Sequence, residues 1–272
     1  MKLSIWSSYY YDLLPEDALR ELKAHGYGYC ELSFEHAGEL MRRGDIRASG
    51  AAFGKFASDL GVEISQGHLS YEAKLCEPEG LAFLKEQIDL FLAMGVRHMV
   101  LHGDGLKGRE DLSEEEKIEK NCEALAELLA YVKDTDAVIC LENLISDRFL
   151  NSIDGLMYFI ERFDSKNLGI CLDTGHLNLC DRDQAGFIRR AGKHLRALHL
   201  ADNEGRTDQH MMPYGRGNVD FATVLRETKA IGYDGLYNLE IPGERCAPME
   251  ILGYKLDYIQ RMFAYLDQVT EA

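Results

Sequence analysis

The strongest constraint on the fold comes from two apolar runs in the second half of the chain. Each run has polar residues at or just after its end. Leu168–Leu172 leads directly into Asp173 and His176. Leu195–Leu200 carries His199 near its end. Short apolar runs bounded by turn residues are typical of strands buried on both faces of a parallel sheet. Ligands bind at the carboxyl ends of such strands, so we expect these polar residues to form part of a site there.

A strand followed by a helix is the pattern of the whole chain. The expected strands are Leu3–Ile5, Tyr29–Phe34, Val62–Ser65, His98–Leu101, Ala137–Leu141, Leu168–Leu172, Leu195–Leu200 and Gly235–Leu239. Helical periodicity predicts helices at Pro15–Gly26, Arg47–Leu60, Glu79–Met94, Ser113–Lys133, Ser152–Phe163, Gln184–Ala191, Phe221–Ile231 and Met249–Leu266. Ser113 and Glu116 have the spacing of a capping box at the start of one of these helices.

This alternation indicates an α/β fold with a parallel sheet. Eight units in 272 residues predict a single (β/α)8 barrel that spans residues 1–272 as one domain, with its active site at the C-terminal ends of the strands. An open doubly wound sheet is the alternative. Such a sheet usually has a glycine-rich phosphate-binding turn after its first strand, and the segment WSSYY (6–10) is not one.

The charge of the chain narrows the range of partners. It has 46 acidic residues against 30 basic ones, which gives a formal net charge of −16. Nucleic acids and anionic membranes recruit basic patches, so we expect neither as a partner. No stretch approaches the ~20 apolar residues of a membrane helix, and the first residues do not resemble a signal peptide. We therefore expect a cytoplasmic protein.

Side chains that can bind metals lie at or just after the ends of six successive predicted strands. These residues are His68, His102, Glu142, Asp173, His199 and Glu240. Glu142 and Asp173 directly end apolar runs, where a carboxylate needs a partner to offset its loss of hydration. The last four strands together offer three carboxylates and one imidazole. We predict that Glu142, Asp173, His199 and Glu240 bind a divalent metal ion.

The predicted ligand set suggests both an ion and a reaction. A set rich in oxygen suits Mn²⁺, Mg²⁺ or Co²⁺ better than a closed structural zinc site. We expect Mn²⁺, with Mg²⁺, Co²⁺ or Zn²⁺ as alternatives. Such an ion can hold a carbonyl oxygen and a neighbouring hydroxyl group and stabilise an enediolate. Glu142 and Glu240 would then act as general base and acid in proton transfer next to the carbonyl.

Four short segments carry a resemblance to a known family. They are CLEN (140–143), CLDTGH (171–176), HLADNEG (199–205) and LEI (239–241). With them the chain resembles the xylose isomerase-like TIM-barrel superfamily, in particular its sugar phosphate isomerase/epimerase branch. The resemblance to its ketose 3-epimerases implies that Glu142, Asp173, His199 and Glu240 hold the metal and that the two glutamates are the acid/base pair. It also implies that His176 and Arg206 bind substrate.

The chain also resembles endonuclease IV, a trinuclear zinc enzyme of the same superfamily. The order of its ligands is matched by His68, His102, Glu142, Asp173, His176, His199, Asp208, His210 and Glu240. The net charge of −16 weighs against a DNA partner. We therefore expect His68, His102, Asp208 and His210 to line the pocket and to bind substrate, although zinc could occupy some of them.

Three classes of function remain open. The first, which we expect, is a metal-dependent isomerase or epimerase acting on a ketose or related sugar. The second is a metal-dependent lyase or dehydratase, and the third is a zinc phosphodiesterase like endonuclease IV. Trp6 follows the first strand and could form a wall of a sugar pocket, although packing explains it equally well. The expected partner is a small sugar-like molecule, and a homo-oligomer is possible.

Overall fold

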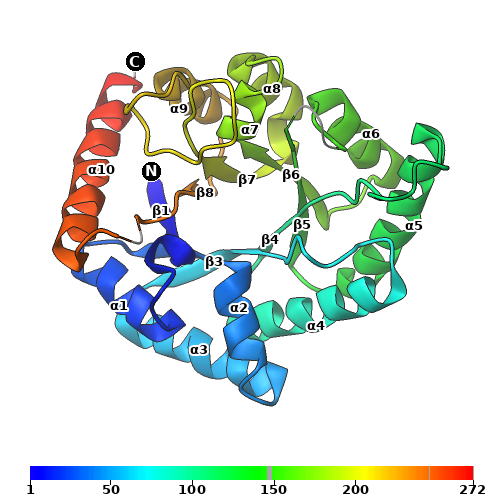
Figure 1. Cartoon of the computed structure of the whole chain (residues 1–272), viewed down its shortest axis with the longest axis horizontal. Helices are drawn as coiled ribbons and strands as arrows, with labels where there is room; N and C mark the ends of the chain where they lie inside the picture. The colour runs from blue at the N-terminus through cyan, green and yellow to red at the C-terminus, as the bar shows by residue number, and fades with distance from the viewer. Residues whose placement is uncertain (146–148, 245, 272) are drawn as a thin grey trace.

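The computed structural model describes residues 1–145, 149–244 and 246–271 and contains a closed barrel of parallel strands surrounded by helices (Figure 1). The eight strands follow one another around the barrel in chain order, and β8 pairs with β1. They are β1 (Lys2–Trp6), β2 (Tyr29–Leu32), β3 (Glu63–His68), β4 (His98–Leu101), β5 (Val138–Glu142), β6 (Leu168–Asp173), β7 (Leu195–Leu200) and β8 (Leu236–Leu239). The (β/α)8 barrel predicted from the sequence is confirmed.

Helices connect the strands and form the outer layer. The α-helices are α1 (Pro15–Ala24), α2 (Phe34–Met41), α3 (Ile46–Leu60), α4 (Pro78–Met94), α5 (Glu114–Val132), α6 (Ile153–Phe163), α7 (Thr174–Asn178), α8 (Gln184–Ala191), α9 (Phe221–Ala230) and α10 (Met249–Val269). Short 3₁₀ segments are η1 (Ser7–Tyr10) and η2 (Gly192–His194). Within the described residues, no helix combines the length and the apolar character needed to cross a lipid bilayer.

Local signals in the sequence set where these helices begin and end. The predicted capping box is present at the start of α5. The Ser113 hydroxyl accepts a hydrogen bond from the Glu116 amide, and the Glu116 carboxylate accepts one from the Ser113 amide. Gly61 and Gly95 end α3 and α4 with φ values of 74° and 97°, a conformation that glycine adopts without steric cost.

The structure differs from the prediction around β2 and β3. β2 ends at Leu32 rather than Phe34, because the Ser33 hydroxyl accepts a hydrogen bond from the His36 amide and begins α2. That helix was not predicted. β3 continues to His68 rather than ending at Ser65, so His68 belongs to the strand itself and its position is fixed by the sheet.

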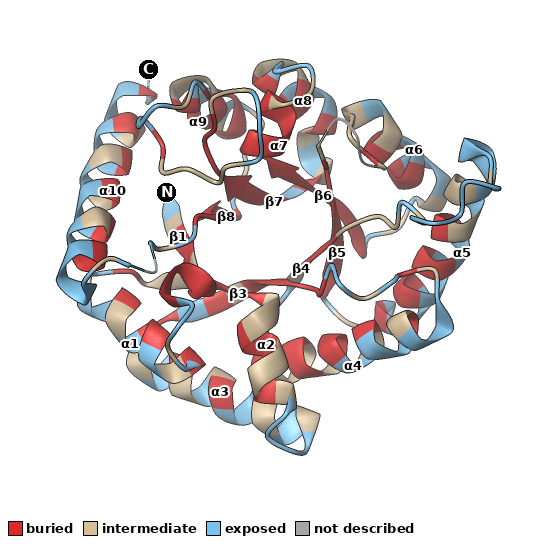
Figure 2. Ribbon diagram, in the orientation of Figure 1, coloured by how far each residue is buried: buried red, intermediate tan, exposed pale blue. Residues whose placement is uncertain are grey.

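The strands and the helix surfaces that face them are mostly buried (Figure 2). The larger apolar group packs between the strands and the helices. A smaller group consists of Val100, Val138, Cys140, Cys171 and Ala197. Its members lie two or four residues before the strand-end ligands, so by strand alternation they point to the same, inner side of the barrel. They form an apolar floor beneath the polar residues.

Two glycines allow α3 and α4 to approach each other closely. A Cβ atom added at Gly50 would lie 2.4 Å from the carbonyl oxygen of Leu90. One added at Gly54 would lie 2.4 Å from the carbonyl oxygen of Met94. Both distances are far shorter than van der Waals contact, and both involve backbone atoms of α4. The packing of these helices therefore requires glycine at both positions.

Gly50→Ala should destabilise the fold, although alanine is the better helix former. Moving the α4 backbone away from the added methyl group should lower the free energy of unfolding by about 1–3 kcal/mol, as measured by urea denaturation. Gly38→Ala in α2 is the matched control, because its Cβ would meet only the end of the Arg42 side chain, at 3.5 Å. The control should be neutral or stabilising by up to about 1 kcal/mol. Equal effects of the two substitutions would contradict this account.

Candidate metal centre

The four predicted metal ligands come from the last four strands of the barrel. Glu142 ends β5, Asp173 ends β6, and Glu240 follows β8 directly. Asp173 lies opposite His199 in the pairing of β6 with β7. Because parallel strands in a barrel present their carboxyl ends at one face, these side chains meet at the same level.

The carboxylates of Glu142 and Glu240 flank one nitrogen of His199. His199 Nδ1 lies 3.0 Å from Glu142 Oε1 and 3.2 Å from Glu240 Oε2. One ligand atom from each of Glu142, Asp173, His199 and Glu240 lies within 4.8 Å of the others, and all four residues are buried. The structure therefore brings together the four residues that the sequence selected.

Asp173 shows that this group is suited to a cation. Its Oδ1 accepts a hydrogen bond of 2.6 Å from the His176 amide. Its Oδ2 is buried and has no hydrogen-bond partner in the described part of the chain, which is a costly state for a carboxylate. Burial raises the pKa of Asp173 to about 6, against the charges of His176 and His210. A divalent ion would satisfy this oxygen, and the donor set fits such an ion.

The remaining carboxylates also require positive charge nearby. Burial alone would raise the pKa of Glu142, but His199 and His102 outweigh it and hold that pKa well below its usual value. The pKa of Glu240 falls to about 2, because the charge and hydrogen bond of His199 outweigh burial. Both glutamates are therefore ionised in the metal-free protein. The centre concentrates negative charge that protonated histidines or a metal ion must balance.

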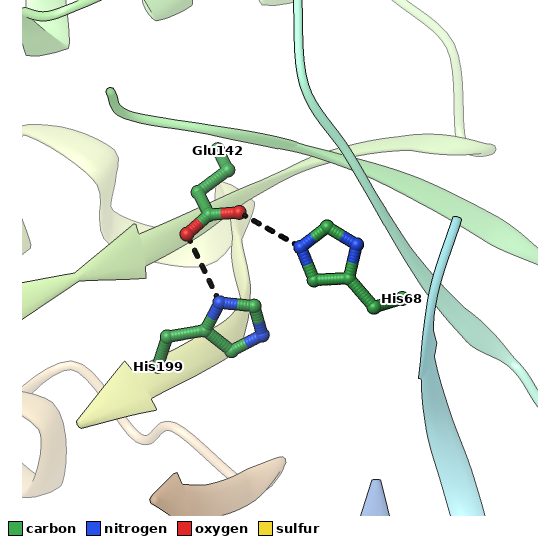
Figure 3. A group of neighbouring side chains, drawn as sticks. All are labelled: His68, Glu142 and His199. Atoms are coloured by element: carbon green, nitrogen blue, oxygen red, sulfur yellow. Dashed lines mark hydrogen bonds and ion pairs between the residues drawn. The ribbon is translucent and has the colours of Figure 1, made fainter. Parts of the chain in front are cut away.

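His68 and His102 contact the second oxygen of Glu142. His102 Nε2 lies 2.9 Å and His68 Nε2 lies 3.5 Å from Glu142 Oε2, and Figure 3 shows Glu142 between His68 and His199. His68, Glu142 and His199 offer a further group of ligand atoms within 4.8 Å of one another. The His102 ring is partly exposed and stacks on Tyr71, with the ring centroids 5.7 Å apart.

Asp173 also belongs to a group with His176 and His210, whose ligand atoms lie within 4.8 Å of one another. Asp208 joins the two histidines, because its carboxylate oxygens lie 3.2 Å from His176 Nε2 and 3.2 Å from His210 Nε2. Burial alone would lower the pKa of His176, but Asp173 and Asp208 raise it to about 10. The structure thus places His176, Asp208 and His210 beside the four-ligand group.

Two other predicted site residues make no hydrogen bond or ion pair with this cluster in the described part of the chain. Arg206 is exposed in the loop after β7, and no ion pair joins it to the cluster among the described residues. Trp6 ends β1 and is partly buried. Its indole nitrogen is buried without a hydrogen-bond partner in the described part of the chain. Their substrate-binding roles stay predictions.

A cavity of about 680 Å³ opens beside the centre and is lined by Tyr71, His102, Asp104, Lys107, Leu144 and Phe149, among others. His102 belongs both to its wall and to the contacts of Glu142. This cavity therefore adjoins the centre through the His102 ring. Another cavity, of about 710 Å³, lies around the strand starts near His98 and Arg196, away from the predicted ligands.

Glu31, in β2, was not among the predicted site residues. It is fully buried, and its Oε1 lies 3.0 Å from His199 Nε2. Gln66 and Asn238 donate hydrogen bonds to its other oxygen. The signal was present in the sequence, because Glu31 interrupts an apolar strand just as Glu142 ends one, and a buried carboxylate needs partners.

The purified protein should bind at least one divalent ion per chain. After loading with Mn²⁺ and desalting, elemental analysis should find a stoichiometric ion in the wild type. Asp173→Ala should lose most of it, because the substitution removes the carboxylate oxygen that lacks another partner. Asp134→Ala is the control, since Asp134 is exposed and outside the ligand groups. A wild type that retains no ion would rule out the proposed centre.

Comparison with known proteins identifies relatives of the chain. Over 163 residues, the chain is 32% identical to an uncharacterized protein of Methanocaldococcus jannaschii. This aligned region covers 57% of this chain and 55% of that protein, so the chain spans about half the length of that relative. The chain is 26% identical over 241 residues to the L-ribulose 3-epimerase of Mesorhizobium japonicum, covering 84% of this chain and 76% of that protein. The solved D-psicose 3-epimerase of Clostridium cellulolyticum H10 has the same fold, with a TM-score of 0.82 and 19% identity over 98% of this chain and 99% of that one.

A family match covers most of the sequence. Residues 19–262 match the family described as xylose isomerase-like TIM barrel. The matched range contains all four predicted ligands and the histidines around them. The resemblance drawn from the sequence is confirmed, and the chain belongs to the xylose isomerase-like TIM barrel family.

Proposed function

We propose that the chain is a divalent-metal-dependent sugar epimerase or isomerase, which moves a proton next to the carbonyl group of a ketose or related sugar. The observation that carries this proposal is the pair Glu142 and Glu240, whose carboxylates approach one His199 nitrogen from two different strands. Two carboxylates at one centre supply a general base and a general acid.

The relatives support this class of enzyme. A protein that is 26% identical over most of the chain is named as an L-ribulose 3-epimerase, which agrees with the isomerase or epimerase expected from the sequence. At this identity the sugar itself does not transfer to the present chain, because small changes in a pocket alter specificity. The proposal therefore extends to ketoses and related sugars as a class.

Glu142, Asp173, His199 and Glu240 would hold the metal ion. Mn²⁺ is the ion we propose, with Mg²⁺, Co²⁺ and Zn²⁺ as alternatives for the same donors. When bound, a divalent ion would polarise the substrate carbonyl and stabilise the negative charge that develops on its oxygen.

The two glutamates would divide the proton transfer. One removes the proton from the carbon next to the carbonyl, which leaves an enediolate. The other, after it has taken up a proton from solvent, delivers that proton to the opposite face of the carbon and inverts it. The floor of small apolar residues beneath them limits access of water from below. Return of the proton to the neighbouring carbon would instead give isomerisation.

The surrounding side chains would hold the sugar. His68, His102, His176 and His210 lie around the carboxylates and can form hydrogen bonds with sugar hydroxyl groups. Asp208 orients two of these rings through its contacts with His176 and His210. Trp6 and Arg206 are proposed as outer contacts of the substrate. The partner is thus a small molecule, and neither nucleic acid nor a membrane is required.

Solvent deuterium tests this mechanism directly. When a panel of ketoses and keto-glycosides is incubated with the Mn²⁺-loaded enzyme in D₂O, the turned-over sugar should carry deuterium next to its carbonyl group. Glu142→Gln and Glu240→Gln should each reduce turnover by ~10² or more, because each removes a proton-transfer group. Mass spectrometry and NMR of the products provide the measurement.

The controls separate the roles of the two glutamates. The metal content of both variants must equal that of the wild type, because both residues are also proposed ligands. Turnover without deuterium incorporation would contradict proton exchange with solvent. Near-normal turnover in either variant would remove that glutamate from the acid/base pair. A product that has lost water would identify the lyase or dehydratase alternative.

One observation favours a second candidate, a zinc phosphodiesterase. Two further groups of possible ligands share residues with the four-ligand group. One consists of His68, Glu142 and His199, and the other of Asp173, His176 and His210. The pocket therefore offers donors for more than one zinc ion. Anomalous scattering at the zinc edge would count the ions, and DNA with an abasic site would test hydrolysis. Three ions and nicked DNA would favour this candidate. One ion and intact DNA, in keeping with the net charge of −16, would favour the epimerase.

A further inference from the structure

Beside the proposed metal ligands lies a further buried carboxylate, that of Glu31 in β2. It is fully buried, and its Oε1 lies 3.0 Å from His199 Nε2. The other nitrogen of the same ring, Nδ1, lies between the Glu142 and Glu240 carboxylates. The His199 ring therefore connects Glu31 on one side with the proposed metal position on the other.

Two amide side chains occupy the second oxygen of Glu31. Gln66 Nε2 donates a hydrogen bond to Glu31 Oε2 at 3.0 Å, and Asn238 Nδ2 donates a short one to the same atom. Both amides have their orientation fixed by further contacts. The Ser4 hydroxyl donates to Asn238 Oδ1 at 2.9 Å, and Gln66 Nε2 also approaches the Leu198 carbonyl oxygen at 3.4 Å. Glu31 Oε2 therefore faces donors only.

This arrangement assigns the proton positions on His199. Two amide groups donate to Glu31 Oε2, so this carboxyl group acts as an acceptor, and His199 Nε2 carries the hydrogen that it donates to Glu31 Oε1. In a neutral imidazole, Nδ1 is then left with its lone pair. That lone pair points toward Glu142 and Glu240, and three neighbouring acceptors become favourable when a proton or a metal ion lies between them.

We propose that Glu31 is a positioning residue, which sets the tautomer and the orientation of His199 so that its Nδ1 can bind the metal ion. The proposal rests on the metal centre of the proposed function and adds to it a residue outside the four ligands. Carboxylates that accept a hydrogen bond from a metal-binding histidine typically change metal affinity by about 10- to 100-fold.

Replacement of Glu31 by glutamine should weaken metal binding strongly, whereas packing alone predicts little change because the two side chains have the same shape. Glutamine has the shape of glutamate, but one oxygen becomes an NH₂ group. Because Gln66 and Asn238 both donate, the glutamine oxygen must face them. The NH₂ group would then face His199 Nε2 and donate to it. This moves the ring proton to Nδ1, where it blocks the metal ion.

Titration of the apo protein with Mn²⁺ by calorimetry tests this inference in four forms: wild type, Glu31→Asp, Glu31→Ala and Glu31→Gln. Affinity should fall in that order. Aspartate keeps an acceptor, alanine leaves the tautomer free, and glutamine enforces the wrong one, with a loss of about 10- to 100-fold or more. A purely structural role predicts the reverse, with the isosteric glutamine least affected and alanine most affected. Equal or tighter binding by Glu31→Gln than by Glu31→Ala would overturn the proposal.

A spectroscopic measurement and a control complete the design. The visible absorption of bound Co²⁺ should persist in Glu31→Asp and weaken sharply in Glu31→Gln at equal protein concentration. Thr228→Val is the control, because Thr228 is also buried and hydrogen-bonded, to Tyr237, but does not contact His199. It should bind Mn²⁺ as the wild type does. If Glu31→Gln does not fold, Glu31→Asp must still bind more tightly than Glu31→Ala, and equal affinities would overturn the inference.

The same experiment distinguishes this inference from the proposed function. A wild type without Mn²⁺ affinity would refute the metal centre itself. A wild type that binds Mn²⁺ while all three Glu31 variants bind equally well would leave the centre in place and refute only the role of Glu31.

Discussion

The buried charge of Glu142 is the constraint on which the centre of this barrel depends. Its carboxylate is fully buried at the end of β5, and its two oxygens lie 3.0 Å from His199 and 2.9 Å from His102. A charge removed from water is tolerated only when it is paired and hydrogen-bonded. His199 in β7 and His102, which directly follows β4, supply the imidazoles that meet this requirement. The surplus of carboxylates that remains, with one Asp173 oxygen unpartnered in the described part of the chain, favours a metal ion.

The barrel makes this arrangement precise because most of the donors belong to strands. Glu142, Asp173 and His199 are strand residues held in the register of the sheet. Glu142 pairs with Cys171, Asp173 pairs with His199, and His199 pairs in turn with Asn238. Asp208 and His210 come from the loop after β7 and are more exposed. Rigid elements hold a reactive centre in place more accurately than loops do. The division suggests that the strand residues hold the ion, while the loop residues adapt to the sugar.

The sequence predicted most of the fold and the four-ligand group because their signals are local. An apolar run that ends in a carboxylate, as at Glu142, marks a strand and its polar end together. The helix α2 was missed because its start depends on one short capping contact at Ser33. Glu31 was missed for another reason: its partner His199 is 168 positions away in the chain, so the charge balance exists only once the barrel is closed. Arg206 was selected by resemblance, and local pattern could not tell that its loop leaves it exposed.

The most direct test of the central claim is a crystal structure of the Mn²⁺-soaked protein with anomalous data collected at the manganese edge. The account predicts a peak within bonding distance of Glu142, Asp173, His199 and Glu240, with His199 bound through Nδ1 and its Nε2 still directed at Glu31. A fully loaded crystal with no peak among these four residues, or with His199 bound through Nε2, would contradict it.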